Sequence, residues 1–223
     1  MITEQFKDLQ YLTVFPKGYV EGEKCPVMIF LHGAGTRGND IDKLKGNPFF
    51  KNISIHSDFP FVIVAPQCNK NTWFDHFQTL KELALFISTS AFADTERIYL
   101  MGASMGGYAT WQLAMSLPDT FAGIVPICGG GMYWNAQRLA STPVWAFHGE
   151  KDRTVLCEES RKMVDAVNQK GGSAKLTVYP EAKHDSWTET YRNPEVWSWL
   201  LSHKKATVNA PVEDGYEGSK AFG

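Results

Sequence analysis

The sequence is poor in cysteine and holds no recognisable metal-binding pattern. It has four cysteines and six histidines among 223 residues. No two cysteines form the close Cys-x-x-Cys pair of a zinc site, and the histidines are equally dispersed. We therefore expect no metal site, and we interpret the cysteines as small, partly buried thiols of a reducing compartment. They are Cys25, Cys68, Cys128 and Cys157.

A strong charge of one sign and long apolar runs are also missing. The net charge of −2 provides no basic field that would attract nucleic acid. No apolar run reaches the ~20 residues that cross a bilayer, so we expect no membrane span. The first residues, MITEQFKDLQYL, include an early acid and lack the apolar segment of a signal peptide. They predict a cytoplasmic protein, but a secreted chain that had lost its leader would look the same.

Short apolar segments do recur along the chain, with helical stretches between them. Strands that are apolar on both faces are typical of a mostly parallel sheet covered by helices on both sides, so the sequence predicts an α/β fold. Apolar residues at helical spacing and suitable end residues predict the helices. The expected strands cover 11–16, 25–33, 59–67, 97–104, 122–130, 143–152 and 174–184, and the expected helices cover 77–90, 105–116, 158–172 and 193–205.

The length and composition predict one domain. A chain of 223 residues fits a single large α/β domain, and no repeat or change of composition marks a second one. We expect this domain to span 1–205. Beyond Lys205 the sequence becomes polar and glycine-bearing without periodicity, so we interpret 206–223 as a flexible tail.

The most informative motif is the Gly-x-Ser-x-Gly turn centred on Ser104. It follows an expected strand and precedes an expected helix, which is the context of a nucleophile elbow. Such a turn holds its serine at unfavourable backbone angles, so residues two positions away on each side must lack a Cβ. Gly102 and Gly106 meet this demand. We predict that Ser104 is a nucleophile.

A serine hydroxyl needs a base, and the base needs an acid that orients it. His184 follows the last expected strand, and Asp152 and Glu150 follow the strand before it. We favour Asp152 over Glu150, although Asp152 could instead cap the segment that begins near Val155. The chain order Ser104, Asp152, His184 is the nucleophile–acid–base order of this elbow fold.

Two backbone amides are candidates for an oxyanion hole. The Met105 amide lies at the start of the helix after the serine, where negative charge is favoured. The second donor is assigned to Ala34, with Gly33 or Gly35 possible, in the glycine-rich stretch after an early strand. That stretch lacks the Gly-Lys-Ser/Thr ending of a phosphate loop. We expect His32 to brace this loop through hydrogen bonds.

Aromatic residues gather in segments that should reach the serine. Loops at the carboxyl ends of parallel strands form the ligand crevice of open α/β sheets. We therefore expect Trp73, Trp134 and Trp187 to bind substrate, with Phe74 and Tyr133 beside the first two, unless these rings only cover their own loops. No insertion is large enough for a lipase lid, so short or aryl acyl groups are expected over long chains.

These blocks together resemble the α/β-hydrolase superfamily, and within it the small esterases of the phospholipase/carboxylesterase and polyhydroxybutyrate-depolymerase-like group. The resemblance implies an α/β-hydrolase fold and a triad of Ser104, Asp152 and His184. Relatives often carry an acid at the position of Thr36, which leaves the pairing of Arg37 open. The resemblance covers about residues 10 to 203, in the blocks LHGAGTRGND, RIYLMGASMGGYATWQLA, IVPICGGG, PVWAFHGEKDRTV and YPEAKHDSWTETY.

The leading functional prediction is a serine carboxylic-ester hydrolase without a cofactor. Its partner would be a small-molecule or carbohydrate-linked ester, and its oligomeric state is open. A peptidase or amidase on the same fold is the enzymatic alternative, made less favourable by the lack of a gating domain. Dienelactone hydrolysis usually employs a cysteine nucleophile, whereas position 104 is serine. A non-catalytic binding protein would be expected to lack at least one of the three triad residues.

Overall fold

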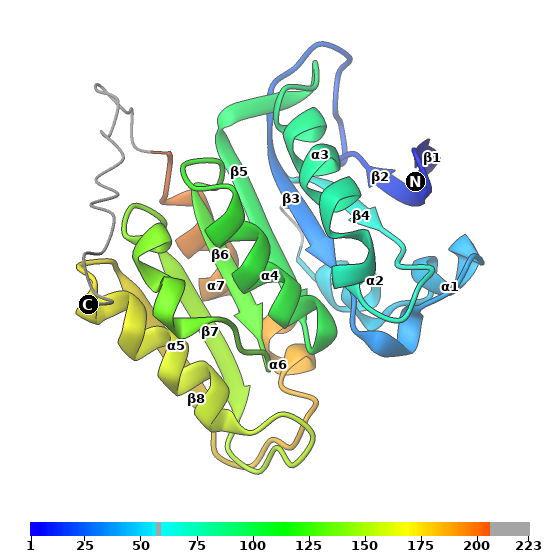
Figure 1. Ribbon diagram of the computed structural model, residues 1–223. Helices are drawn as coiled ribbons and strands as arrows, with labels where there is room; N and C mark the ends of the chain where they lie inside the picture. Colours follow the sequence, from blue (N-terminus) through cyan, green and yellow to red (C-terminus); the bar gives the residue numbers. More distant parts are fainter. Residues whose placement is uncertain (57–58, 206–223) are drawn as a thin grey trace, which may run out of the picture.

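The computed structural model describes residues 1–56 and 59–205, and it contains one eight-stranded sheet (Figure 1). The strand order is β1-β2-β4-β3-β5-β6-β7-β8. The β1–β2 and β2–β4 pairs are antiparallel, and the remaining neighbours are parallel. The strands are β1 (Ile2–Phe6), β2 (Leu9–Val14), β3 (Cys25–Leu31), β4 (Val62–Pro66), β5 (Ala93–Ala103), β6 (Gly123–Ile127), β7 (Val144–Gly149) and β8 (Ala174–Tyr179).

Helices cover both faces of the sheet. In Figure 1 α3, α4 and α5 lie in front of the strands, and α6 and α7 lie behind them. The α-helices are α1 (Ile41–Lys45), α2 (Pro48–Ile53), α3 (Phe77–Ser88), α4 (Met105–Ser116), α5 (Cys157–Gln169), α6 (Trp187–Arg192) and α7 (Pro194–Leu201). Three short 3-10 helices are η1 (Ala34–Thr36), η2 (Trp73–His76) and η3 (Tyr133–Leu139).

The central strands are apolar on both faces because each face packs against its own layer of helices. In β3, Ile29 points into the cluster formed with α3, α4 and α5, whereas Phe30 points into the cluster formed with α2, α6 and α7. The neighbouring strand β5 divides its side chains in the same way, with Leu100 on the first face and Met101 on the second. This alternation follows from the two-residue period of a strand. The expectation of a mostly parallel sheet covered on both sides is confirmed.

Most expected elements are present, with boundaries that differ by a few residues: β5 begins at Ala93, before the expected strand over 97–104, and β8 ends at Tyr179, before the expected end at 184. The expected helix over 193–205 ends at Leu201, and α6 was not expected. β1 was also not expected because its residues are mostly exposed and show no apolar alternation. α1 and α2 are the other unpredicted helices, and each has an asparagine or aspartate cap, Asp40 and Asn47.

The parallel strands end along one edge of the sheet, and the loops there carry the residues singled out above. Ala34 follows β3, Ser104 follows β5, and the segments after β7 and β8 bring Asp152 and His184. Ligands of open α/β sheets bind at this carboxyl edge. Within the described residues, no helix is long and apolar enough to cross a membrane. The expected tail, 206–223, lies outside the described residues.

Candidate active site

Ser104 occupies a strained turn between β5 and α4. Its backbone has φ 56° and ψ −116°, a conformation that L residues rarely adopt. A Cβ on Gly102 would lie 2.4 Å from the Gly106 carbonyl oxygen, and a Cβ on Gly106 would lie 1.9 Å from that of Leu31. Both positions therefore exclude any side chain, as the elbow motif predicts. The Ser104 amide donates to the Ile127 carbonyl at 2.9 Å, which ties the turn to the end of β6.

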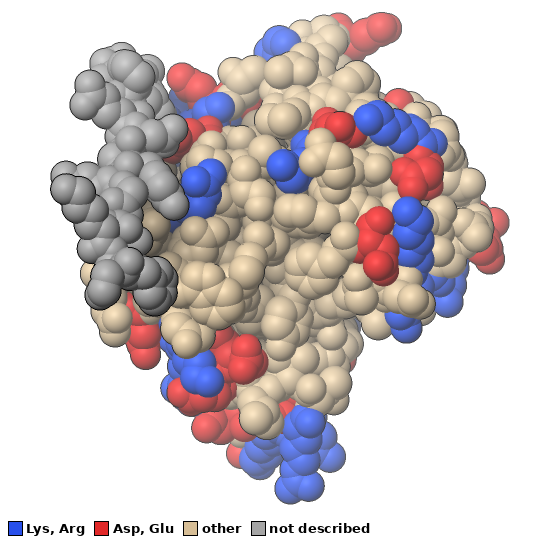
Figure 2. Space-filling model, in the orientation of Figure 1, with Lys and Arg blue, Asp and Glu red and all other residues tan. Residues whose placement is uncertain are grey.

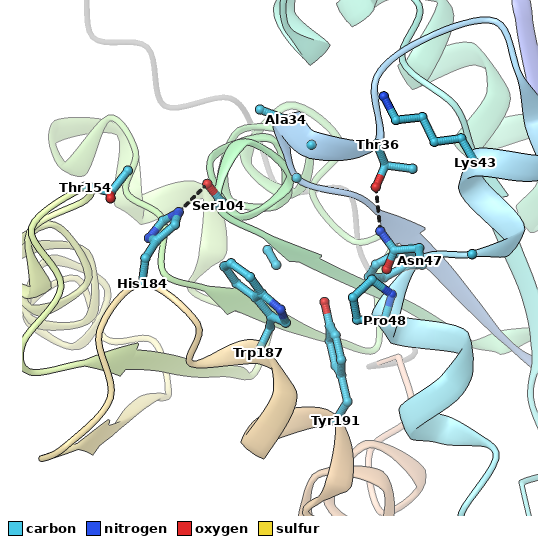
Figure 3. A pocket seen from close by; sticks show the side chains of 15 residues that line it. Ala34, Thr36, Lys43, Asn47, Pro48, Ser104, Thr154, His184, Trp187 and Tyr191 are labelled. Carbon is cyan, nitrogen blue, oxygen red and sulfur yellow. Dashed lines mark hydrogen bonds between the residues drawn. The ribbon is translucent and has the colours of Figure 1, made fainter.

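The three predicted triad residues form one chain of hydrogen bonds. Ser104 Oγ lies 2.8 Å from His184 Nε2, and His184 Nδ1 lies 2.7 Å from Asp152 Oδ2 (Figure 3). Because a carboxylate only accepts, Nδ1 carries the proton and Nε2 is free to accept from the serine hydroxyl. This is the tautomer that a general base beside Ser104 requires.

Asp152 is buried, and all its hydrogen bonds favour the charged form. Its side chain is 0% exposed, and Oδ1 accepts from the amides of Thr154 at 2.8 Å and Val155 at 3.0 Å. Burial opposes ionisation, but the hydrogen bonds from His184 and these two amides outweigh it and lower the pKa of Asp152. The alternative of a helix cap at Asp152 is wrong, because α5 begins at Cys157 and its N-cap is Leu156. Asp152 Oδ1 instead holds the turn before this helix, while Oδ2 accepts from His184.

Glu150, the competing acid, lies on the surface away from the histidine. Its Oε2 accepts from Arg161 at 2.6 Å, and both side chains are exposed. Of the two predicted candidates, the structure brings only Asp152 into contact with His184.

A second histidine, His148 of β7, lies behind Asp152 and was not predicted to belong to the site. Its Nε2 is 3.3 Å from Asp152 Oδ2 and 2.9 Å from the Val155 carbonyl, so Nε2 faces two acceptors and carries the proton. Its Nδ1 lies 2.7 Å from the Ser160 hydroxyl. Burial lowers the pKa of His148. A neutral His148 therefore donates to the Asp152 loop and fixes the carboxylate from its buried side.

The loop that carries His184 crosses closely over the end of β7. A Cβ on Gly149 would lie 2.1 Å from the Lys183 carbonyl oxygen and 2.5 Å from that of Ala182. Only glycine admits this approach, which brings His184 to Asp152. The Trp187 ring then meets the His184 ring edge-on, with 5.3 Å between centroids.

The loop after β3, which carries the predicted oxyanion donor Ala34, packs against the serine turn. A Cβ on Gly33 would be 3.6 Å from Ser104 Cβ, so this loop is close to the nucleophile. Met105 is the first residue of α4, and its amide has no carbonyl acceptor within the helix. Figure 3 shows Ser104 between His184 and the loop of Ala34. Amides at Ala34 and Met105 thus flank the serine, where they could hold a developing negative charge.

His32 braces this loop, as expected. Its Nδ1 donates to the Gly33 carbonyl at 2.7 Å, and its Nε2 accepts from the Cys68 amide at 3.0 Å. The Trp73 ring packs against the His32 ring in a tilted arrangement, with 4.9 Å between centroids, and its Nε1 donates to the His32 carbonyl at 3.0 Å. Burial lowers the pKa of His32 to about 4. Protonation of Nε2 would also break its hydrogen bond with the Cys68 amide, because both groups would then be donors.

Arg37 holds the far end of the same loop. Its guanidinium donates to the carbonyls of Ala34 at 3.0 Å and Asn71 at 2.6 Å. The pairing left open by Thr36 is therefore made with backbone carbonyls. The Thr36 hydroxyl accepts a hydrogen bond from the side-chain amide of Asn47 at 2.8 Å.

A cavity of about 580 Å³ opens beside Ser104 and His184. It runs between the β3 loop and α6, and its walls are largely apolar. Trp187, predicted to bind substrate, lines it. Tyr191 also lines it, and sequence reasoning missed this residue. The helical spacing of Tyr191, four residues after Trp187, would have indicated it once α6 was recognised.

Trp73 and Trp134 lie away from this cavity. Trp73 is 0% exposed and belongs to the core beneath the His32 loop, where it supports the loop and cannot reach a ligand in the cavity. Trp134 is 65% exposed on η3, and Tyr133 packs against it at 5.3 Å. Phe74 borders a separate apolar hollow with Met132 and Tyr108. The expectation that these aromatic residues gather around the serine is met only at Trp187.

A cysteine lies against the acid and base of the site. Cys128, Asp152 and His184 offer ligand atoms within 4.8 Å of one another. Burial raises the pKa of the Cys128 thiol to about 12, so the thiol stays protonated and is a poor metal ligand. The hydrogen bonds of Asp152 and His184 already use the other donor atoms. All four cysteines are buried and unpaired, as expected.

Comparison with known proteins provides a family match. Residues 68–213 match the model of the dienelactone hydrolase family, which is more than half of the 223 residues. Among solved structures, one titled as a thermostable esterase superimposes with a TM-score of 0.76 and 31% identity, covering 91% of this chain and 63% of that chain.

Two curated relatives differ in their named activities. Dipeptidyl-peptidase 5 of Porphyromonas gingivalis is 20% identical over 222 residues, which cover 77% of this chain and 32% of that protein. A probable carboxylesterase, SOBER1-like, of Arabidopsis thaliana is 27% identical over 108 residues, which cover 46% of this chain and 41% of that protein. The chain thus spans less than half the length of either relative.

Proposed function

Because this chain belongs to the dienelactone hydrolase family of α/β hydrolases, we propose that it is a serine carboxylic-ester hydrolase that acts through Ser104, His184 and Asp152. The observation that carries the proposal is the continuous hydrogen-bond chain from Ser104 Oγ through His184 to the buried Asp152. The nucleophile position holds serine, so the thiolate chemistry usual in dienelactone hydrolysis is not proposed here.

The reaction would proceed through an acyl-enzyme. Ser104 Oγ attacks the ester carbonyl carbon while His184 Nε2 takes the hydroxyl proton. The amides of Met105 and Ala34 hold the carbonyl oxygen as it becomes negative. His184 then returns the proton to the leaving alcohol, and it activates a water that releases the acid and restores Ser104. Asp152 stays ionised throughout and stabilises the imidazolium.

The proposed substrates carry short or aryl acyl groups. The cavity beside Ser104 is bounded by Trp187 and the β3 loop, which leaves room for a compact acyl group. Its apolar walls favour hydrocarbon or aromatic groups over charged ones. The alcohol portion, whether a small molecule or a carbohydrate, remains open.

A serine peptidase is the second candidate, since one curated relative is named a dipeptidyl-peptidase and peptidases use the same triad. The comparison that separates the two is hydrolysis of 4-nitrophenyl acetate against 4-nitroacetanilide. We expect turnover of the ester alone. Amide turnover at a comparable kcat/KM would favour the peptidase.

Replacement of Ser104 tests the proposal directly. Ser104→Ala should lower kcat for 4-nitrophenyl acetate by about 10⁴-fold, because no other group can form the acyl-enzyme. A fluorophosphonate should add one label to the unmodified protein and none to this variant, as measured by intact-protein mass. Ser198→Ala, on the exposed surface of α7, is the control and should label normally. An unmodified protein that neither labels nor hydrolyses any ester would support a non-catalytic binding protein instead.

A further inference from the structure

One of the polar side chains that reach the cavity beside Ser104 is that of Tyr191. Tyr191 of α6 is 1% exposed, and it lines the same cavity as Ser104. Figure 3 shows its hydroxyl directed into the cavity, on the far side of Trp187 from Ser104. Among the described residues, no hydrogen bond to this hydroxyl is found.

Two other buried tyrosine hydroxyls are hydrogen-bonded within the protein. Tyr99 donates to the His203 carbonyl at 2.8 Å, and Tyr179 accepts from the Thr190 hydroxyl at 3.3 Å. Buried hydroxyls are normally satisfied, because an unpaired one loses its hydration without compensation. The Tyr191 hydroxyl faces the cavity without a hydrogen-bond partner among the described residues, so a ligand in the cavity could supply one.

The Tyr191 side chain is held rigidly in this position. Its ring packs edge-on against Phe49 at 5.1 Å and Phe30 at 6.0 Å. Its own carbonyl accepts from Trp197 Nε1 at 3.0 Å, which fixes the end of α6. A preorganised hydroxyl costs little further entropy when it forms a hydrogen bond to a ligand.

The part of the cavity between Ser104 and the Tyr191 hydroxyl suits a flat, uncharged portion of a ligand. Trp187, Phe30 and Pro48 contribute apolar surface along the cavity. Lys43 is the only Lys, Arg, Asp or Glu among the described residues that line it. Its ammonium donates to the Arg37 carbonyl at 3.0 Å, near the β3 loop and away from Tyr191 (Figure 3). A carboxylate beside Tyr191 would therefore be buried without a counter-ion.

We propose that the Tyr191 hydroxyl recognises a neutral oxygen on the far edge of an aryl acyl group, so that this protein prefers esters of hydroxy- or alkoxy-aryl acids over esters of the unsubstituted acids. The inference rests on the proposed function, because the acyl group is anchored at Ser104. Tyr191 then acts as a specificity residue that contacts the substrate and takes no part in the proton transfers.

The experiment compares methyl 4-hydroxycinnamate with methyl cinnamate, which have the same leaving group. The unmodified protein should hydrolyse the hydroxylated ester with the higher kcat/KM. Tyr191→Phe should lower the ratio of the two kcat/KM values by about 3- to 10-fold, the usual strength of one neutral hydrogen bond. Tyr99→Phe, a buried tyrosine outside the cavity, is the matched control and should leave the ratio unchanged.

The outcomes separate a failure of the role proposed for Tyr191 from a failure of the proposed esterase function. If the unmodified protein hydrolyses both esters and Tyr191→Phe leaves the ratio within twofold, the role of Tyr191 is overturned and the esterase proposal stands. If the unmodified protein hydrolyses no ester, the proposed function fails first.

Thermal unfolding provides an independent readout. Tyr191→Phe should keep or raise the midpoint, because it removes a buried hydroxyl without a protein partner. Tyr99→Phe should lower the midpoint, because it leaves the His203 carbonyl unpaired. A lower midpoint for Tyr191→Phe, equal to that of Tyr99→Phe, would show that its hydroxyl serves the fold and would overturn the proposal.

Discussion

At the scale of single residues, the two carboxylate oxygens of Asp152 accept hydrogen bonds from different partners. Oδ1 accepts the amides of Thr154 and Val155, which hold the loop, and Oδ2 accepts from His184. His148 approaches Oδ2 from the buried side. Asp152 is therefore both the orienting acid and the structural centre of its loop, and its replacement has consequences for both.

We predict that Asp152→Asn lowers kcat by roughly 10³–10⁴-fold, because an amide at this position favours the wrong imidazole tautomer. The variant should keep its fold, since the side-chain oxygen of asparagine can still accept from the loop amides. Glu150→Gln is the matched control and should be nearly neutral, because Glu150 pairs only with exposed Arg161. Steady-state kinetics with 4-nitrophenyl acetate measures both, and the reverse ranking would identify Glu150 as the acid.

At the scale of elements, the site depends on how closely neighbouring segments approach. The 182–183 backbone crosses β7 within 2.1 Å of where a Gly149 Cβ would stand. No flexible side chain could move aside there, because the neighbouring atoms are backbone carbonyls. A side chain at this position must displace the loop that carries His184.

We predict that Gly149→Ala lowers kcat by about 100-fold through displacement of His184, since misplacement by about 1 Å has this effect on catalysis. KM should change less, because the cavity walls at the β3 loop and α6 are not altered. Gly123→Ala on the neighbouring strand is the control: its Cβ would meet other atoms only at 3.6 Å or beyond. Equal activity in the two variants would contradict this account of how His184 is positioned.

At the scale of the whole molecule, three buried histidines link stability to pH. Burial lowers the pKa of His32 to about 4 and also lowers the pKa of His76 and of His148. In the unfolded chain a histidine titrates near pH 6.5. Between these values the unfolded state binds more protons than the folded state, so the free energy of unfolding falls as the pH drops from about 6.5 to about 4.

We predict that His32 alone accounts for about 3 kcal/mol of this loss, from its pKa shift at 1.36 kcal/mol per unit. Urea unfolding at pH 7.0, 5.5 and 4.5 should show stability decreasing with pH. His32→Gln should be less stable at pH 7, but its stability should depend less steeply on pH. The remaining dependence should come from His76 and His148. The same slope in both proteins would show that His32 is not the titrating group.

The elbow could be predicted from the sequence because it depends on local chain geometry, and the triad could be predicted because Ser104, Asp152 and His184 follow the known order of this elbow fold. Glycines at 102 and 106, a strand before Ser104 and a helix after it are all visible in the residue pattern. The apolar segments likewise indicated the sheet, since a strand buried on both faces cannot be polar on either. The short helices α1, α2 and α6 were not predicted because five or six residues carry too little periodicity.

The sequence by itself thus determined the sheet, the serine turn and the identity of an acid and a base near it, because backbone sterics and burial constrain residue types locally. Only the tertiary structure decided which acid contacts His184, which aromatic residues reach the cavity, and that Tyr191 points into it without a partner. Trp73 and Trp187 each begin a short helix that follows a strand at the same sheet edge, yet one supports a loop and the other lines the cavity. Such differences depend on side-chain packing between segments far apart in the chain, and no pattern within one segment records them.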